Sequence, residues 1–374
     1  MRRIKYIYQN KNWPNFTWDY RLITPLLASF RLQQGILLGK MSSIGFTLKN
    51  QASYEIITQD VLKTSKIEGE LLDTDSVRSS VGKRLGIKST IVAQKNHQVD
   101  GVVDVLLDAI NHRDKILTKN KLFTWHKVLF PLEINSVNKI QIGKWRTQSS
   151  GPMQVISGPY GKEQVHYEAP SYLYIEKEIE LFLLWLKNEN NLDLVLKSAI
   201  AHLWFITIHP FDDGNGRISR AISDMLLAKS EESPFRFYSL SSQIESERKS
   251  YYDILEKTQK GELDITLWLE WYLDALKKSI ENSDSILTKV LFNNTFWNIH
   301  RNHSINDRQQ RMLDILLDNF IGKLTTSKWA KMTKCSQDTA LRDIIDLINK
   351  DILYKDSSGG RSTHYLLKEL PNSK

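Results

Sequence analysis

Apolar residues recur along this chain with the spacing of helices over most of its length. In the stretch NQASYEIITQDVLKTSKIEGE, Tyr54, Ile57, Val61 and Leu62 follow one another at steps that place them on one helix face. Gly69 comes just after the last turn and is a common helix stop. The same pattern predicts a mainly helical chain, with helices within 23–69 and over 99–110, 121–130, 175–187, 192–208, 217–228, 246–260 and 265–280.

Two segments depart from this pattern. Between residues 149 and 170, the β-prone pieces MQVIS and QVHYE flank the turn residues GPYG, which predicts a β-hairpin with a loop of four or five residues. After residue 306, an amphipathic helix (309–319) precedes two short helices (326–332 and 337–349) and two strands (352–355 and 362–367) around Ser358-Gly359-Gly360. This is the element order of a winged-helix module, so we expect a domain boundary near residues 290–305.

The composition narrows the class of protein. Of 374 residues, 41% are hydrophobic and 25% charged, which excludes global disorder, and the low count of 17 glycines and 9 prolines favours helices over β-sandwiches and barrels. The single cysteine, Cys335, excludes an intramolecular disulfide and fits a reducing compartment. The basic start lacks the apolar core of a signal peptide, and no apolar run could span a bilayer. We therefore expect a cytoplasmic protein.

The net charge of +8 permits nucleotide or nucleic-acid binding but does not establish it, because the basic residues are spread along the chain. The stretch HPFDDGNGRISR, residues 209–220, is more informative. Its glycine-rich turn leads directly into a helix, whose N-terminal N–H groups form an anion site. Arg217 and Arg220 lie on one helix face beside this site, Asp213 offers an oxygen ligand for Mg²⁺, and His209 is a candidate general base. These groups suit phosphoryl-type transfer from a nucleotide.

This stretch resembles the signature of the Fic domain, His-Pro-Phe-x-Asp/Glu-Gly-Asn-Gly/Lys-Arg, and matches it at every specified position, including the second arginine. The opening YIYQNKNWPNFTWD, the predicted hairpin and the segment SERKSYYDILEKTQKG are similar to further parts of one bacterial branch of the family. The resemblance implies three parts: an N-terminal helical region (1–100), a Fic catalytic core with a hairpin flap (101–290) and a winged-helix domain (300–374). The fold class is then all-α, with the flap as its main β element.

Fic proteins mostly transfer AMP from ATP to a hydroxyl side chain of a target protein, and the resemblance implies the same activity here. His209 would be the base, Asp213 would hold Mg²⁺ or Mn²⁺, and Arg217 and Arg220 would bind the leaving pyrophosphate and the γ-phosphate. The remaining phosphate contacts would come from Gly214, Asn215 and Gly216. Adenine would lie between the flap and the segment after the motif, near Val155, Ile156, Ser157, Gly158, Tyr251, Tyr252 and Gln259.

A second motif lies far upstream. Thr64-Ser65-Lys66-Ile67-Glu68-Gly69 fits the inhibitory-helix pattern of Fic proteins, Ser/Thr-x-x-x-Glu-Gly/Asn. Glu68 is expected at a helix C-terminus, where a negative charge opposes the helix dipole unless a cation neutralises it. The resemblance makes Arg220 that cation. With Arg220 paired to Glu68, ATP would bind in a non-productive pose, so we expect an autoinhibited enzyme.

Two alternatives stay open at this point. The same site could remove AMP from a modified protein, with Glu68 positioning a water molecule. The chain could also be a DNA-binding regulator with a nucleotide-sensing Fic domain, using Lys328, Lys331, Lys334 and Arg342 of the helix-turn-helix. DNA binding is the less favoured of these, because Asp338, Asp343 and Asp346 would repel phosphate. The resemblance is also compatible with a homodimer, and the sequence does not name the target protein.

Overall fold

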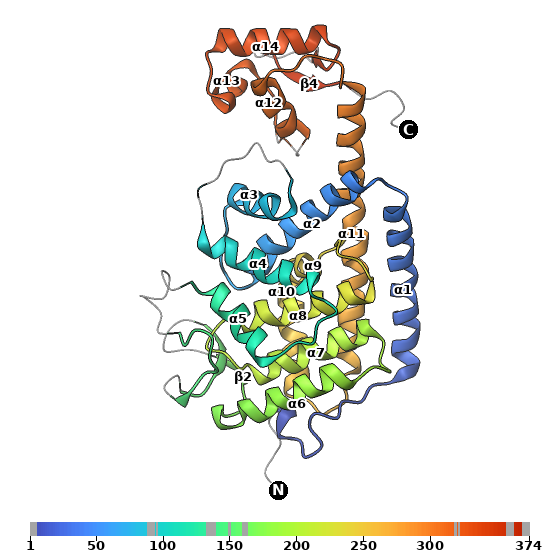
Figure 1. Cartoon of the computed structure of the whole chain (residues 1–374), viewed down its shortest axis with the longest axis vertical. Helices are drawn as coiled ribbons and strands as arrows, with labels where there is room; N and C mark the ends of the chain where they lie inside the picture. Colours follow the sequence, from blue (N-terminus) through green and yellow to red (C-terminus); the bar gives the residue numbers. More distant parts are fainter. Residues whose placement is uncertain are drawn as a thin grey trace. The chain divides into compact units, whose positions relative to one another are not determined.

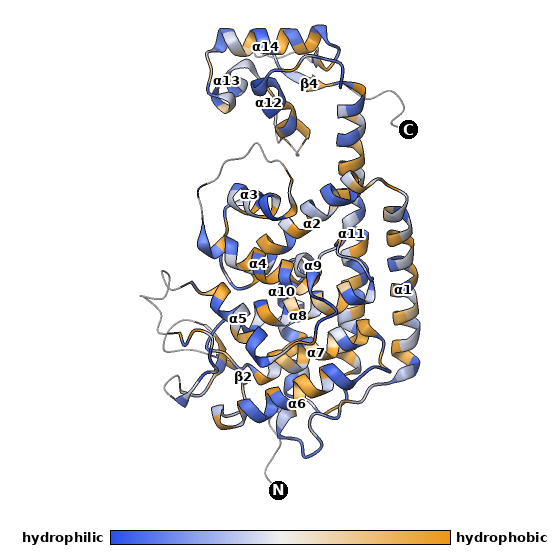
Figure 2. Cartoon of the chain, viewed as in Figure 1, coloured by the Kyte–Doolittle hydropathy of each residue, from blue (hydrophilic) through white to orange (hydrophobic). Residues whose placement is uncertain are grey.

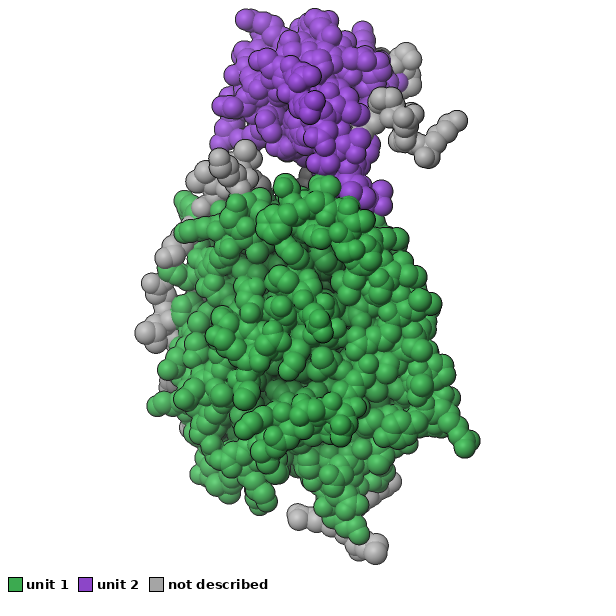
Figure 3. Space-filling model, turned by 45° about the vertical axis from the view of Figure 1, so that its right-hand side comes forward, with its two compact units in different colours: residues 1–286 green, residues 287–374 purple. Residues whose placement is uncertain are grey.

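A computed structural model describes residues 6–87, 94, 96–131, 140–148, 151–158, 164–317, 320, 322–356 and 363–368. These residues form two compact units, residues 1–286 and 287–374, which Figure 3 shows in different colours. The predicted turns at Pro159-Tyr160-Gly161 and Ser358-Gly359-Gly360 lie outside the described residues. Among the described residues, none of the helices combines the length and the apolar character that a bilayer span requires.

The first unit is built from helices and one hairpin (Figure 1). Its helices are α1 (Tyr20–Ser42), α2 (Phe46–Ile67), α3 (Thr74–Leu85), α4 (His97–Asn111), α5 (Lys119–Leu129), α6 (Ile175–Asn188), α7 (Leu194–Ile208), α8 (Asn215–Ser230), α9 (Leu240–Ser246), α10 (Arg248–Gln259) and the start of α11 (Thr266–Ile299). The strands β1 (Gln154–Ser157) and β2 (Gln164–Glu168) pair antiparallel. The helical pattern expected within residues 23–69 corresponds to two helices, α1 and α2, because the chain turns at Ser43–Gly45.

The core of the first unit surrounds α7 and α8. α7 is apolar on all sides, as its colour in Figure 2 indicates, and every residue from Val195 to Ile208 is buried. Such a helix is stable only inside a protein, with other helices around it. α8 packs along α7, and α2, α4, α5 and α9 also contact α8. The motif between α7 and α8 is therefore held by the best-packed pair of helices in the unit.

The N-terminal aromatic residues are docked on this core, as their density in the sequence predicts. Tyr6 is 1% exposed and packs edge-to-face on Tyr167 of β2, with ring centroids 5.2 Å apart. Trp13 packs against Trp204 of α7 in the same manner, and its indole N–H donates to Glu178 at 2.8 Å. The N-terminal segment thus fixes the hairpin and α7 from one side.

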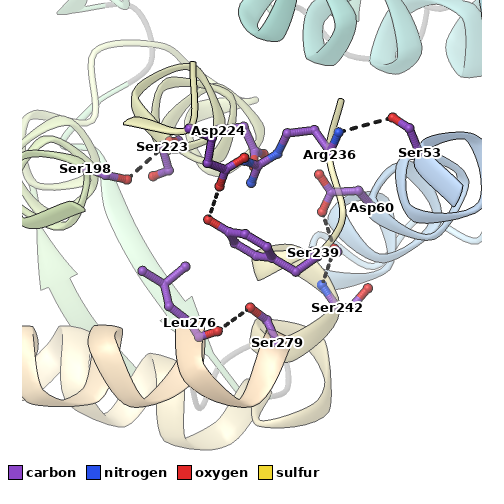
Figure 4. A network of polar contacts seen from close by, with 12 residues as sticks. Ser53, Asp60, Ser198, Ser223, Asp224, Arg236, Ser239, Ser242, Leu276 and Ser279 are labelled. Carbon is purple, nitrogen blue, oxygen red and sulfur yellow. Dashed lines mark hydrogen bonds and ion pairs between the residues drawn. The ribbon is translucent and has the colours of Figure 1, made fainter. Parts of the chain in front are cut away.

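A buried polar network attaches α2 to the segment after α8 (Figure 4). The guanidinium of Arg236 donates to Asp224 of α8 at 3.1 Å and to Glu231 at 2.8 Å. Its backbone N–H donates to Ser53 of α2 at 3.2 Å, and Ser239 donates to Asp60, also in α2. Because buried charges are stable only when they are paired, this network specifies where α2 lies.

The second unit contains the end of α11, the helices α12 (Asp307–Leu317), α13 (Thr326–Thr333) and α14 (Gln337–Asn349), and the strands β3 (Leu353–Lys355) and β4 (Tyr365–Leu367). β3 and β4 pair antiparallel, and Leu324 forms a further bridge with Tyr365. Trp329 lies at the centre of its core, fully buried. Asp343, expected to repel phosphate from the face of α14, is instead buried and ion-paired with Arg308 at 2.9 Å.

Candidate active site

The loop between α7 and α8 presents the N-terminus of α8. α7 ends at His209, whose φ of 51° and ψ of 59° are left-handed and turn the chain away from the helix axis. Gly214, with a φ of 79°, precedes α8. The side chain of Asn215 closes the loop, accepting from the N–H of Phe211 at 2.9 Å and donating to its carbonyl at 2.8 Å. The Asn215 amide, which we expected to contact phosphate, is thus engaged within the loop. The first N–H groups of α8 are the groups available to an anion.

His209 has the orientation and charge of a base. Its Nδ1 lies 3.1 Å from the carbonyl of Ile206, which can only accept, so Nδ1 carries the proton and Nε2 has a free lone pair. Burial lowers the pKa of His209 to about 4, and the ring is therefore neutral at pH 7. A neutral ring can take a proton from a bound hydroxyl group.

Both arginines of the motif are buried and paired with carboxylates from the end of α2. Arg220, 2% exposed, donates to Glu68 at 2.6 Å and to the Oγ1 of Thr64 at 2.7 Å. Arg217 donates to Glu70 at 2.9 Å. The geometry thus brings Arg220 to Glu68 and Thr64, which lie 152 and 156 residues before it in the sequence.

The end of α2 is shaped to deliver these carboxylates. Glu68 is the C-cap, and Gly69 follows with a φ of 87°, a conformation that costs glycine little. The N–H of Glu70 then bonds back to the carbonyl of Ser65 at 3.0 Å, as in a Schellman motif. This turn directs Glu68 and Glu70, two residues apart, to Arg220 and Arg217, three residues apart on α8.

Electrostatics and close packing hold Glu68 in place. The Arg220 guanidinium, together with Arg217 and His209, lowers the pKa of Glu68 in spite of its burial, so it is a carboxylate at neutral pH. A Cβ atom on Gly216 would lie 2.1 Å from Oε1 of Glu68, so only glycine at this position lets the carboxylate reach Arg220. Nε of Arg217 and Nη1 of Arg220 are nevertheless buried without a hydrogen-bond partner among the described residues. Such unpaired donors are costly, and an anion would satisfy them.

A pocket of about 740 Å³ opens beside the loop. His209, the loop and the head of α8 form one side of this pocket. The hairpin and α10 form the other side. The candidate residues that line it are Glu68, Val155, Ile156, Ser157, His209, Asp213, Gly214, Asn215, Gly216, Arg220, Tyr251, Tyr252 and Gln259. Arg217 and Gly158 do not line it, but Arg217 lies 3.7 Å from Asp213, which does.

Some of the lining residues also have structural partners. The hydroxyl of Tyr251 lies 2.9 Å from Nε2 of His202, the buried histidine that we expected to be a core residue. Gln259 is buried, and its amide donates to Thr207 at 3.2 Å. Tyr252 is 36% exposed and is therefore the more accessible of the two tyrosines.

Asp213 is the motif carboxylate that we expected to hold a metal. Its side chain is half exposed and faces the pocket, and its Oδ1 accepts from the N–H of Gly214 at 2.5 Å. Among the described residues, no group of three or more His, Cys, Asp and Glu side chains could hold an ion by itself. A metal here would need oxygens of a bound phosphate to complete its ligands, which is how Mg²⁺ is usually held beside nucleotides.

The sequence did not reveal several residues that support the site. Arg146 is buried and donates to the carbonyl groups of His209 at 2.7 Å and Pro170 at 2.5 Å, which fixes the loop to the chain after the hairpin. His126 stacks on Phe211 and lies 3.2 Å from the carbonyl of Asp213. Neither has a motif around it, and each acts through a contact that only the folded chain creates. Glu70 could have been suspected from its closeness to Glu68.

Comparisons with known proteins agree with this geometry. Residues 116–227 match the model of the Fic/DOC family. The chain contains a Fic domain. Residues 6–87, which include the segment from Thr64 to Gly69, match a domain of unknown function, DUF4172.

Curated relatives of this Fic-domain chain carry adenylyltransferase names. A probable protein adenylyltransferase of Aquifex aeolicus is 38% identical over 63 residues, 17% of this chain and 20% of that one. The protein adenylyltransferase Fic of Drosophila ananassae is 24% identical over 237 residues, 62% of this chain and 42% of that one. The chain thus spans less than half the length of these relatives. A Fic family protein from Desulfovibrio desulfuricans has the same fold, with a TM-score of 0.53, 19% identity and 96% and 99% of the two chains covered.

Proposed function

We propose that this protein transfers AMP from ATP to a hydroxyl side chain of another protein. The observation that carries the proposal is the position of His209, whose ring is neutral with a free Nε2. It lies at the edge of a pocket that the N-terminus of α8 and Arg220 also line. An anion site, a cation and a base around one pocket are the groups that phosphoryl transfer needs. The adenylyltransferase names of the curated relatives support the same activity.

In the proposed reaction, the N–H groups at the head of α8 and the two arginines hold the triphosphate. His209 takes the proton of the acceptor hydroxyl, whose oxygen forms a bond to the α-phosphorus while the bond to the bridging oxygen of the β-phosphate breaks. Pyrophosphate leaves, and AMP remains on the target. Asp213 would hold Mg²⁺, which neutralises phosphate charge when it is bound.

We further propose that Glu68 inhibits the reaction. Arg220 cannot serve both Glu68 and a γ-phosphate, and the pair is buried on the arginine side, so its coupling is on the order of 1–3 kcal/mol. Such a coupling is enough to keep most molecules inactive. The trigger that displaces Glu68 and the identity of the target are not part of the proposal.

The test is label transfer from α-labelled ATP to proteins of a cell lysate by four proteins: wild type, Glu68→Gly, His209→Ala and the double variant. We expect Glu68→Gly to transfer more label than wild type. The double variant should transfer at least about 100-fold less label than Glu68→Gly, because base catalysis is absent. Equal transfer by Glu68→Gly and the double variant would disprove the role of His209. If Glu68→Gly instead loses the ability to remove AMP from a modified protein, the site favours the reverse reaction.

The second unit is, in our interpretation, a winged-helix domain. The order α12, α13, α14, β3 and β4, with Leu324 bridging to Tyr365, supports this interpretation. The outer face of α14 exposes Leu341 and Ile345 as well as Arg342, so it is not a purely basic surface. We therefore favour a protein-contact role over DNA binding.

A further inference from the structure

His166 occupies a specially shaped position in the hairpin. Val155 pairs with Tyr167 and Ile156 with Val165, so His166 is an extra residue without a partner in β1. Such a β-bulge turns a side chain out of the regular alternation and is frequent beside active sites. Here it directs the imidazole towards α10 and the pocket, whose lining includes His166.

Both ring nitrogens of His166 are engaged by groups from different elements. Nδ1 lies 2.6 Å from Oε2 of Glu256 in α10, and Nε2 lies 2.5 Å from Oγ of Ser157 in β1. Lys260 binds the other carboxylate oxygen of Glu256. Ser157, His166 and Glu256 all line the pocket. They form a polar chain across the place where the hairpin meets α10.

The direction of the protons in this chain follows from the chemistry of the groups. Hydrogen bonds from Lys260 and His166 lower the pKa of Glu256, which is therefore a carboxylate and can only accept. Nδ1 of His166 must then carry a proton. When the ring carries this proton alone, Nε2 is an acceptor, and the hydroxyl of Ser157 donates its only proton to it. The oxygen of Ser157 is left with lone pairs alone to offer to a ligand.

The part of the pocket around Ser157 suits a nucleotide base. Phosphates would lie at the head of α8, on the opposite side of the pocket. Besides its polar groups, this side of the pocket is lined by Val155 and Ile156 of the hairpin and by Tyr252 and Leu255 of α10. A flat aromatic base between these walls would present its polar edge to Ser157. Ligand pockets commonly combine apolar walls with a few placed polar groups in this way.

We propose that Ser157, oriented by His166 and Glu256, reads the exocyclic amino group of the base and so selects adenine over a base with a carbonyl group at that position. This proposal rests on the proposed nucleotide-binding function. An oxygen that can only accept pairs with an amino group and repels a carbonyl oxygen. Discrimination of this kind is stronger than that given by shape alone, because the wrong base leaves polar atoms unpaired.

The experiment compares ATP with inosine triphosphate, in which a carbonyl replaces the amino group. Dissociation constants are measured by isothermal titration calorimetry on the full chain for wild type and for Ser157→Ala, His166→Ala and Glu256→Gln. Lys257→Ala, on the exposed side of the same helix, is the matched control. We expect wild type and the control to prefer ATP by about tenfold or more, the ratio that one such hydrogen bond supports.

Each variant should act on this preference for its own reason. Ser157→Ala removes the acceptor, His166→Ala frees the hydroxyl to donate, and Glu256→Gln no longer fixes which ring nitrogen carries the proton. In all three the preference should fall to about threefold or less. A variant Ser157→Ala that keeps the wild-type preference would overturn this proposal and leave the nucleotide site intact. Absence of ATP binding to both wild type and Glu68→Gly would overturn the proposed function as well.

Discussion

At the scale of single residues, the pairing of Arg217 is as informative as that of Arg220. Arg217 is 4% exposed and is neutralised by Glu70, while Nε remains without a partner. An anion with more acceptor atoms than one carboxylate could bind Nε of this guanidinium as well. Glu70 therefore competes for one arginine as Glu68 competes for the other.

We predict that Glu70→Gln increases AMP transfer by about 3- to 10-fold over wild type. The amide still accepts a hydrogen bond, so Arg217 keeps a partner, but its charge becomes available to the triphosphate. The measurement is the rate of label transfer from α-labelled ATP, with Glu180→Gln, at an exposed position of α6, as the matched control. If Glu70→Gln and Glu180→Gln behave alike, the carboxylate at residue 70 has no inhibitory role.

His202 gives a prediction about pH. Burial lowers its pKa to about 3, whereas in the unfolded chain it is near 6.5. As the pH falls from 7 to 5, only the unfolded state binds the extra proton, so His202 contributes a loss of about 2 kcal/mol to the free energy of unfolding. Glutamine does not titrate. The destabilisation caused by His202→Gln at pH 7 should therefore shrink by about 2 kcal/mol at pH 5.

The measurement is urea unfolding of wild type and His202→Gln at the two pH values. Asp224, whose pKa is raised by burial and by Asp60, gains stability as the pH falls and so acts in the opposite direction. It is present in both proteins, and its contribution cancels in the difference. A difference that does not change with pH would show that His202 is accessible to protons in the folded state.

At the scale of elements, the position of α2 decides whether Glu68 and Glu70 reach their arginines. The buried network around Arg236 fixes this position, since it contains Asp60 of α2 and Asp224 of α8 (Figure 4). Arg236 is 2% exposed and is the cation that balances Asp224 and Glu231. α2 and the residues after it are thus attached to α8 and the segment after it at two places, the network and the carboxylate pairs.

We predict that Arg236→Met lowers the free energy of unfolding of the first unit by about 3–5 kcal/mol, because it leaves buried carboxylates unpaired. Hydrogen exchange followed by mass spectrometry should show faster exchange in peptides of α2 and α8. Arg21→Met, at an exposed position of α1, is the matched control. Unchanged exchange in α2 would mean that the network does not hold this helix.

The helices could largely be predicted from periodicity, and the exceptions have physical reasons. α3 was missed because its sequence, TDSVRSSVGKRL, has few apolar positions, and its fully buried apolar side chains are Val77 and Val81. α11 continues to Ile299, well beyond the expected end at Ile280, through the polar stretch ENSDS. Polar residues on an exposed helix face remove the periodic pattern without breaking the helix.

At the scale of the whole molecule, the sequence identified the groups of the motif but not the contacts that complete the site. A motif is a local pattern, so it could show the anion loop, its arginines and His209. The pairing of Glu70 with Arg217, the bonds of Arg146 to the loop and the chain through His166 and Glu256 join segments far apart in sequence. No local pattern encodes such contacts, because they depend on how the helices pack.

We expect the two units to unfold independently of each other. Trp329 is fully buried in a core formed by residues of the second unit alone, and Trp268 is equally buried in the first, where its indole N–H donates to the carbonyl of Ala199 at 2.9 Å. Truncating a buried tryptophan costs about 3–5 kcal/mol, a large part of the stability of a small unit. Trp329→Ala should therefore lower the melting temperature of the second unit and leave ATP binding within about twofold of wild type.

Trp268→Ala should abolish ATP binding, because Trp268 packs against His202 and Tyr251 behind the pocket. Calorimetric melting and ATP titration of both variants decide the matter, and loss of ATP binding in Trp329→Ala would show that the second unit is needed for the fold of the site.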